Sequence, residues 1–206
     1  AKPMEEEPGS SMHIHQSLID IKTGENIFAG KDGEKFSPEF YHYLGGLQKY
    51  TPNAISFYAP NVNSYRRFTP DMSAPVNTKW GIDNRTTGLR APEAPPVATR
   101  IENRFPGADC NPYLAIAASL ACGYLGLKGK IQPTKPTTDA AAEEGDQVEV
   151  ARTLEEGLRL LEDCPELKEI FGDQFVDAYI GVKRAEFETF NKVISSWERE
   201  YLLLTV

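Results

Sequence analysis

The pentapeptide RIENR at residues 100–104 constrains the fold of this chain more than any other segment. In an extended strand, successive side chains point to opposite faces of the sheet. Arg100, Glu102 and Arg104 would therefore share one face, while Ile101 would lie on the other, apolar face. Three alternating charges on one face are unusual for a core strand. The pattern is typical of either a solvated strand edge or a functional surface.

A second segment with the same alternation lies near the start of the chain, at residues 12–18. His13, His15 and Ser17 are separated there by residues predicted to face the other way, so one face of a strand is predicted to be polar. Two imidazoles at this spacing can bind a metal ion or a phosphate. Two such strands in one chain favour a shared functional surface over two separate solvated edges.

Further cations lie between these two strands in the sequence. Arg66 and Arg67 are adjacent and flanked by aromatic residues, and Arg85 and Arg90 lie near the ends of a short predicted strand. Guanidinium groups bind carboxylates and phosphates through paired hydrogen bonds, and they can neutralise charge that develops during phosphoryl transfer. A carboxylate and an imidazole can share Mg²⁺ or Mn²⁺. The set suggests a nucleotide, a metal and a carboxylate substrate together.

Composition excludes several other classes of function. The chain has 206 residues, which suits one domain with a sizeable core, and its 40% hydrophobic and 25% charged residues are typical of a globular protein. The net charge of -8 argues against nucleic acid as a partner, although a bound nucleotide needs only local cations. No apolar run is long enough to span a bilayer, so no membrane partner is expected. The three cysteines lack metal-ligand spacing and suggest a reducing compartment.

Helices are predicted where capping residues precede an apolar period. Ser37 begins a helix to about residue 50, and Thr51-Pro52 is predicted to start a second short helix to about residue 58. Asn111-Pro112 begins a long helix whose small residues imply close packing. The other predicted elements are short strands at 78–82 and 86–90, helices at 149–162 and 173–201, and a short turn at 166–171.

Five segments resemble, in the same order, motifs of the glutamine synthetase family. They cover most of residues 1–128 and are GSSMHIHQSL at 9–18, NSYRR at 63–67, WGIDNR at 80–85 with Arg90, RIENR at 100–104, and NPYLA at 111–115. The resemblance implies that residues 1–206 are the C-terminal portion of one catalytic domain. Residues 1–128 would carry the active-site strands and a packing helix, and residues 129–206 a loop and a helical layer. The fold class expected is α+β, a partial curved and mostly antiparallel sheet backed by helices, without the family's N-terminal β-grasp-like domain.

The resemblance also implies an activity and a role for each matched residue. The family's reaction joins the γ-carboxyl of glutamate to the nitrogen of ammonia or an amine, with ATP and Mg²⁺ or Mn²⁺, through a γ-glutamyl phosphate. By motif match, His13 and Glu102 would bind the metal, and the residues that would bind ATP are His15, Ser17, Arg85 and Arg100. The residues that would bind glutamate are Gly9, Arg67 and Arg104. Arg85 and Arg90 would contact the transferring phosphoryl group.

The family further implies a cytoplasmic location and a large homo-oligomer of stacked rings, in which a neighbouring subunit closes the active site. His13 and Glu102 would need a third carboxylate to complete their metal site. The chain alone is therefore expected to be inactive.

The loop after Arg67 departs from the pattern of ammonia-using members, which have a glycine after the proline and a glutamate just before "AP". Those positions are Asp71 and Ser73 here. Serine is a poor general base at neutral pH unless another group activates it, so Asp71 is a candidate for that role. The shorter side chain at position 73 leaves room for an amine larger than ammonia. The segments at 84–90 and 106–109 also resemble the branch that ligates glutamate to putrescine or other amines. The sequence favours that branch, with glutamine synthetase as the alternative.

Two hypotheses of other classes compete with a ligase. A non-catalytic family member or fragment is one, but it would have no physical reason to keep desolvated charges, which are destabilising when unpaired. A nucleotide-binding module with another acceptor is the second. Arg67 and Arg104 argue against it if they face one pocket, because an arginine pair suits an amino-acid carboxylate.

Overall fold

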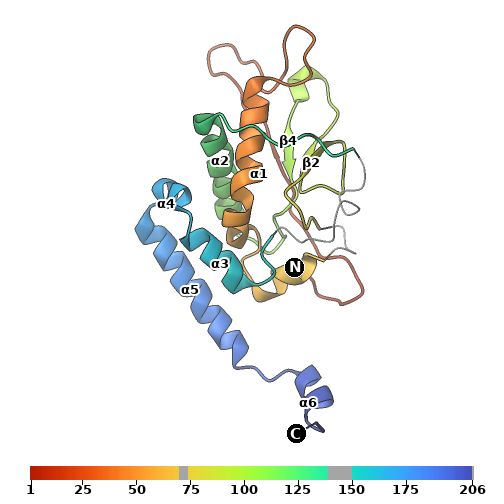
Figure 1. Ribbon diagram of the computed structural model, residues 1–206, viewed down its shortest axis with the longest axis vertical. Helices are drawn as coiled ribbons and strands as arrows, with labels where there is room; N and C mark the ends of the chain where they lie inside the picture. The colour runs from red at the N-terminus through yellow and green to blue at the C-terminus, as the bar shows by residue number, and fades with distance from the viewer. Residues whose placement is uncertain (70–73, 139–149, 206) are drawn as a thin grey trace.

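The computed structural model describes residues 1–69, 74–138 and 150–205, so Asp71 and Ser73 lie outside the described residues. Its strands form one small sheet with the order β1-β4-β3-β2, and helices α1 and α2 lie together beside it (Figure 1). The strands are β1 (Ile14–Gln16), β2 (Trp80–Ile82), β3 (Leu89–Ala91) and β4 (Ile101–Asn103). The prediction of an α+β fold is confirmed.

The sheet is mixed, because one of its strand pairs is parallel. Strand β4 pairs antiparallel with both β1 and β3, whereas β2 and β3 run parallel. Between β2 and β3 the chain turns back at residues 83–88, and the backbone N–H of Leu89 donates to the carbonyl of Lys79 at 3.1 Å. A hairpin between β2 and β3 would have been the simplest expectation for strands so close in sequence.

The core lies between the sheet and two long helices, α1 (Pro38–Tyr58) and α2 (Pro112–Gly129). The small residues predicted to allow close packing do so where the two helices cross. A Cβ added to Gly126 would lie 2.6 Å from the Cα of Gly46, which leaves no room for a side chain at that point. Asn111 caps α2 by accepting from the backbone N–H of Tyr113 at 3.0 Å, as its position before a proline predicts.

The prediction of a break at Thr51-Pro52 is wrong, because α1 continues through Pro52 to Tyr58. Proline in a helix interior removes one backbone hydrogen bond and is destabilising by about 3 kcal/mol. Tertiary packing offsets that penalty here. Thr51 and Ala54 are fully buried, and the side-chain amide of Asn53 donates to the carbonyl of Leu160 at 2.9 Å.

The C-terminal region is a series of helices rather than one long final helix. The helices are α3 (Leu154–Glu162), α4 (Pro165–Phe171), α5 (Asp173–Asn191) and α6 (Ser196–Leu202). Two 3₁₀ helices, η1 (Val62–Arg67) and η2 (Pro96–Ala98), lie earlier in the chain, between α1 and α2. The predicted helix at 173–201 is interrupted because Ser195 and Glu198 form a capping box that starts α6.

The end of the chain projects away from the body of the fold (Figure 1). Trp197 stacks on Tyr201, yet both are 58% exposed, and Leu204 is 89% exposed. Large apolar side chains in such a position are typical of an interaction surface. Within the described ranges, the structure contains no helix with the length and apolar character that a membrane crossing requires.

Candidate active site

The polar face of the sheet is built by the register of three neighbouring strands. His15 of β1 lies opposite Glu102 of β4, and Glu102 lies opposite Arg90 of β3. The next row, Ile14 with Asn103 and Leu89, points to the buried face. The alternation in residues 12–18 and 100–104 therefore predicted both faces correctly, because side chains of paired strands share a face.

Glu102 is the centre of a charged cluster on this face, and only 3% of it is exposed. Its Oε1 lies 3.0 Å from Nδ1 of His13 and accepts a hydrogen bond of 3.0 Å from Nη1 of Arg104. Its Oε2 accepts a hydrogen bond of 2.6 Å from Nη1 of Arg90. Both oxygens of one buried carboxylate are thus held by an imidazole and two guanidinium groups.

The electrostatics of this cluster stabilise the ionised carboxylate. Burial by itself would raise the pKa of Glu102, but hydrogen bonds with His13 and Arg90 and the charge of Arg104 outweigh it, so the pKa lies well below its usual range. The pKa of Arg90 is raised, because its hydrogen bonds to Glu102 and Asp83 outweigh desolvation. Asp83, which forms an ion pair with Arg90, is a member of the cluster that the sequence analysis missed.

His15 and Arg100 form a second contact on the same face. Nε of Arg100 donates to Nδ1 of His15 at 3.2 Å, and burial lowers the pKa of His15. The register places His15 on the same face as Glu102, as predicted, and its Nδ1 accepts the hydrogen bond from the arginine.

A buried polar network supports the cluster from the opposite face, and the sequence analysis missed it. The Tyr43 hydroxyl of α1 donates to Oε1 of Gln16 at 2.7 Å, and the Gln16 amide donates to Oγ of Ser119 in α2 at 2.7 Å. The Asn103 amide donates to the same Oγ at 3.0 Å. A polar residue at a core position of β1 is the signal that could have revealed it. The network joins β1 and β4 to the two long helices.

Arg67 lies apart from the Glu102 cluster, at the end of η1. It is 1% exposed, and Nη1 and Nη2 each donate to the carbonyl of Phe105 at 3.4 Å. Gly9 lies directly against its aliphatic stem, because a Cβ there would lie 2.9 Å from Cδ of Arg67. The structure thus brings Gly9 and Arg67 together, as their predicted shared role in glutamate binding requires. Arg104, the third residue of that group, is held instead by Glu102.

Two predicted site residues take no part in the contacts of the Glu102 cluster or of Arg67. Arg85 lies in an exposed turn, and Ser17 follows β1 at an exposed position. Within the described residues, neither side chain forms a hydrogen bond or an ion pair. Their predicted contacts with ATP stay predictions.

The donor set around Glu102 fits part of a divalent-metal site. Among the described residues, no group of three or more histidine, cysteine or acidic side chains is close enough to hold a metal ion. His13 and Glu102 contribute one imidazole and one carboxylate, which are donor types that Mn²⁺ and Mg²⁺ accept. Octahedral coordination takes about six ligands, so the remaining ligands would come from water, substrate or other protein segments.

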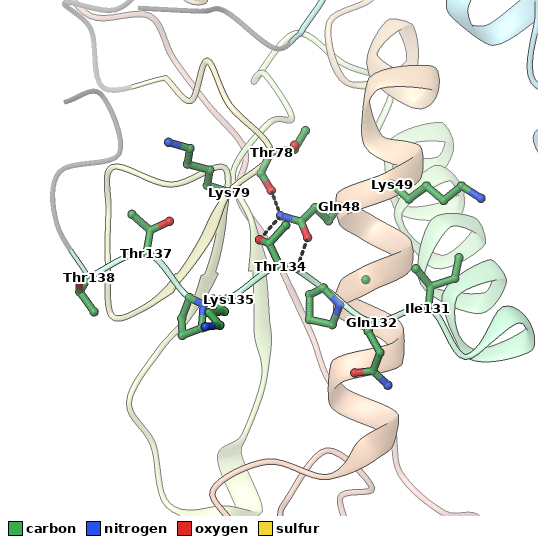
Figure 2. Close-up of a pocket in the computed structure, with 13 residues that line it drawn as sticks. Gln48, Lys49, Thr78, Lys79, Ile131, Gln132, Thr134, Lys135, Thr137 and Thr138 are labelled. Atoms are coloured by element: carbon green, nitrogen blue, oxygen red, sulfur yellow. Dashed lines mark hydrogen bonds between the residues drawn. The ribbon is translucent and has the colours of Figure 1, made fainter. Parts of the chain in front are cut away.

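A separate hollow of about 680 Å³ lies between α1, the start of β2 and the segment at residues 131–138 (Figure 2). Gln48 closes one side of it by donating to the carbonyl of Thr78 at 3.1 Å and accepting from the backbone N–H of Thr134 at 2.8 Å. None of the predicted site residues that the structure describes lines this hollow. Its contacts hold the 131–138 segment against α1.

Comparison with known proteins identifies the class to which this fold and site belong. Residues 1–202 match the family model described as "Glutamine synthetase, catalytic domain". A type-1 glutamine synthetase of Dictyostelium discoideum is 36% identical over 208 residues, with 98% of this chain and 40% of the relative covered. A glutamate–isopropylamine ligase of a Pseudomonas species is 37% identical over 201 residues, with 96% of this chain and 44% of the relative covered.

A solved structure described as "GmaS/ADP complex-Conformation 1" superposes with a TM-score of 0.86 at 31% identity, with 98% of this chain and 48% of that chain covered. The chain belongs to the glutamine synthetase family, and the resemblance noted in its motifs is confirmed. Its relatives are ligases that act on glutamate. The chain spans about half the length of the relatives it matches.

Proposed function

We propose that the whole protein containing this chain is an ATP-dependent ligase that joins glutamate to an amine of the putrescine or polyamine class. The chain would be the C-terminal portion of its catalytic domain, with active-site strands in residues 1–128 and a helical layer in residues 129–206. The observation that carries the proposal is the Glu102 cluster. A buried carboxylate joined to an imidazole and two guanidinium groups is not needed for stability alone, because a well-packed apolar core in its place is often at least as stable.

The chemistry divides into two transfers. An oxygen of the glutamate γ-carboxylate attacks the γ-phosphorus of ATP, and ADP leaves with the electrons of the broken P–O bond. The amine nitrogen then attacks the acyl carbon, phosphate leaves, and a base takes a proton from the nitrogen. Preorganised guanidinium groups stabilise the charge that develops in both steps. We assign Arg85 and Arg90 to the transferring phosphoryl group and Asp71 or Ser73 to the region of the base.

The remaining roles are those that the motif match implies. The proposal assigns the glutamate carboxylates to Arg67 and Arg104, with the Gly9 backbone at the amino group. It assigns the nucleotide side to His15, Ser17, Arg85 and Arg100. His13 and Glu102 would hold a divalent cation, which supplies positive charge to the phosphates when bound. The proposed cofactor set is thus ATP with Mg²⁺ or Mn²⁺.

The choice of acceptor rests on Ser73 and on the relatives. A serine leaves more space than the glutamate of ammonia-using members, and an amine ligase and a glutamine synthetase are about equally similar to this chain. We therefore keep glutamine synthetase as the second candidate. Association into a homo-oligomer is part of the proposal and is supported by the exposed apolar residues around Trp197 and Leu204. A cytoplasmic location is likewise proposed.

The test is glutamate-dependent ADP release by the whole protein, with putrescine, isopropylamine and ammonium compared at equal concentrations. Faster release with an amine supports the amine ligase, whereas faster release with ammonium makes the protein a glutamine synthetase. No glutamate-dependent release with any acceptor would refute both and favour a non-catalytic member. The 206-residue chain alone is expected to show no turnover, because His13 and Glu102 supply only part of a metal site.

Two variants test whether the activity depends on the Glu102 cluster. Glu102→Gln keeps the shape but removes the charge that holds His13 and the arginines, and we expect a loss in kcat/KM on the order of 100-fold or more. Glu162→Gln is the matched control, because Glu162 also accepts two hydrogen bonds from an arginine, Arg184, on the distant α3–α5 surface. Equal activity of the two variants would contradict the assignment of Glu102.

A further inference from the structure

Arg67 is a buried cation with an incomplete set of hydrogen bonds. Its only acceptor in the described chain is the carbonyl of Phe105, at 3.4 Å, and its buried Nε has no partner there. Burial lowers the pKa of the guanidinium, because the charged form loses hydration. A buried charge of this kind is destabilising unless an opposite charge lies near it.

Asp109 supplies that opposite charge without forming a direct ion pair. A Cβ added to Gly107 would overlap Oδ1 of Asp109 and would lie 2.6 Å from Nη1 of Arg67. The carboxylate and the guanidinium therefore both lie next to Gly107. Oδ1 of Asp109 is buried and has no hydrogen-bond partner among the described residues. The charge of Asp109 is the largest influence that opposes the effect of burial on Arg67.

The same carboxylate also holds the element that carries Arg67. Oδ2 of Asp109 accepts from Oγ of Ser64 at 2.6 Å and from the side-chain amide of Asn61 at 3.0 Å. These residues form the capped start of η1, whose last residue is Arg67. These hydrogen bonds lower the pKa of Asp109 against the effect of its burial, so the carboxylate stays ionised.

The turn that carries Asp109 is itself fixed to two other segments. The backbone N–H of Gly107 donates to the carbonyl of Tyr58 at the end of α1, at 2.9 Å. The backbone N–H of Ala108 donates to the carbonyl of Ser10 at 3.2 Å, next to Gly9. The turn at residues 107–109 therefore joins η1, the end of α1 and the segment next to Gly9, and a change at Asp109 would reach the guanidinium through both charge and geometry.

We propose that Asp109 is a positioning residue for Arg67, and that it sets the affinity for the carboxylate of the amino-acid substrate without contacting that substrate. The inference rests on the proposed function, which assigns Arg67 to a glutamate carboxylate. A direct ion pair would occupy the donors of the guanidinium. The indirect arrangement stabilises the buried charge of Arg67 and holds the side chain in place while it leaves donors for a ligand.

The experiment compares three variants of the whole protein by steady-state kinetics. Asp109→Asn keeps the shape and an acceptor oxygen for Ser64 but removes the charge. Ser64→Ala keeps the charge but removes one of the contacts that hold η1. Glu162→Gln is the control for loss of a carboxylate elsewhere on the surface.

For Asp109→Asn we expect the KM for glutamate to rise about tenfold, with the KM for ATP and kcat changed by less than about threefold. Ser64→Ala should shift the KM for glutamate in the same direction, and Glu162→Gln should leave it unchanged. An unchanged KM for glutamate in Asp109→Asn would overturn the inference. So would a parallel change in both KM values and kcat, because that pattern indicates general damage to the fold.

A structural measurement keeps the inference separate from the proposed function. If the wild-type protein shows no glutamate-dependent ADP release, the proposed function fails, and crystal structures of the wild type and Asp109→Ala then decide the inference. We expect the guanidinium of Arg67 to move by about 1 Å or more, a shift large enough to impair a binding site. An Arg67 side chain that stays in place in Asp109→Ala would refute the positioning role.

Discussion

Ser119→Ala tests whether the buried network behind the sheet holds the active-site strands. Ser119 is fully buried in α2, and its Oγ accepts from the amides of Gln16 at 2.7 Å and Asn103 at 3.0 Å. The substitution leaves both amides without this acceptor, and each unsatisfied buried donor is destabilising by about 1–3 kcal/mol. The higher helix propensity of alanine returns up to about 0.5 kcal/mol. We expect a net loss of about 2–5 kcal/mol in the free energy of unfolding.

Ser56→Ala is the matched control, because Ser56 is also a fully buried serine of a long helix but its Oγ has no hydrogen-bond partner among the described residues. Removing an unsatisfied buried hydroxyl is expected to be neutral or slightly stabilising. Urea unfolding, followed by circular dichroism and by tryptophan fluorescence, measures both variants. With a slope of about 2–3 kcal/mol per M, Ser119→Ala should lower the midpoint by about 1–2 M. Equal midpoints for the two variants would refute the reasoning.

Two further predictions concern the helix crossing and a buried thiol. Gly126→Ala should destabilise the chain by about 1–3 kcal/mol, because the added Cβ would overlap the backbone of α1. Gly181→Ala should stabilise the chain by about 0.5–1 kcal/mol, because the added Cβ would meet nothing within 4 Å. Thermal unfolding of the two variants should therefore show opposite shifts in Tm. Burial raises the pKa of Cys122 to about 12 in the folded chain, whereas the thiol of the unfolded chain has a pKa of about 8.5. Between these pH values only the unfolded chain loses the proton, so the free energy of unfolding should fall as pH rises, by about 2 kcal/mol at pH 10. Cys122→Ala should flatten that decline in urea titrations at pH 8.5 and 10, and an unchanged decline would contradict it.

The local pattern of the sequence was sufficient to assign the faces of the strands. His13, His15 and Glu102 lie on the polar face because alternation along a strand is a property of neighbouring residues. The start of α2 at Asn111-Pro112 was predictable for the same reason, since a helix cap depends on residues within one turn. The resemblance to the family also followed from local motifs, which the comparison with known proteins confirmed.

The partners of these side chains depended on contacts between distant segments, and no local pattern encodes them. The sequence showed Gln16 between two site residues, but only the packing of α1 and α2 gave it Tyr43 and Ser119 as partners. Likewise, Pro52 predicted a helix break that the burial of its neighbours overrode.

The sequence by itself determined which residues face the same way, because side-chain direction follows from the backbone period. Only the tertiary structure decided which of them meet. Glu102 lies 3.0 Å from His13, and the carboxylate of Asp109 lies near Arg67, because strand order and loop closure bring together groups that are far apart in the chain. Those long-range pairings set the burial and the charge of the site, and burial and charge govern its chemistry.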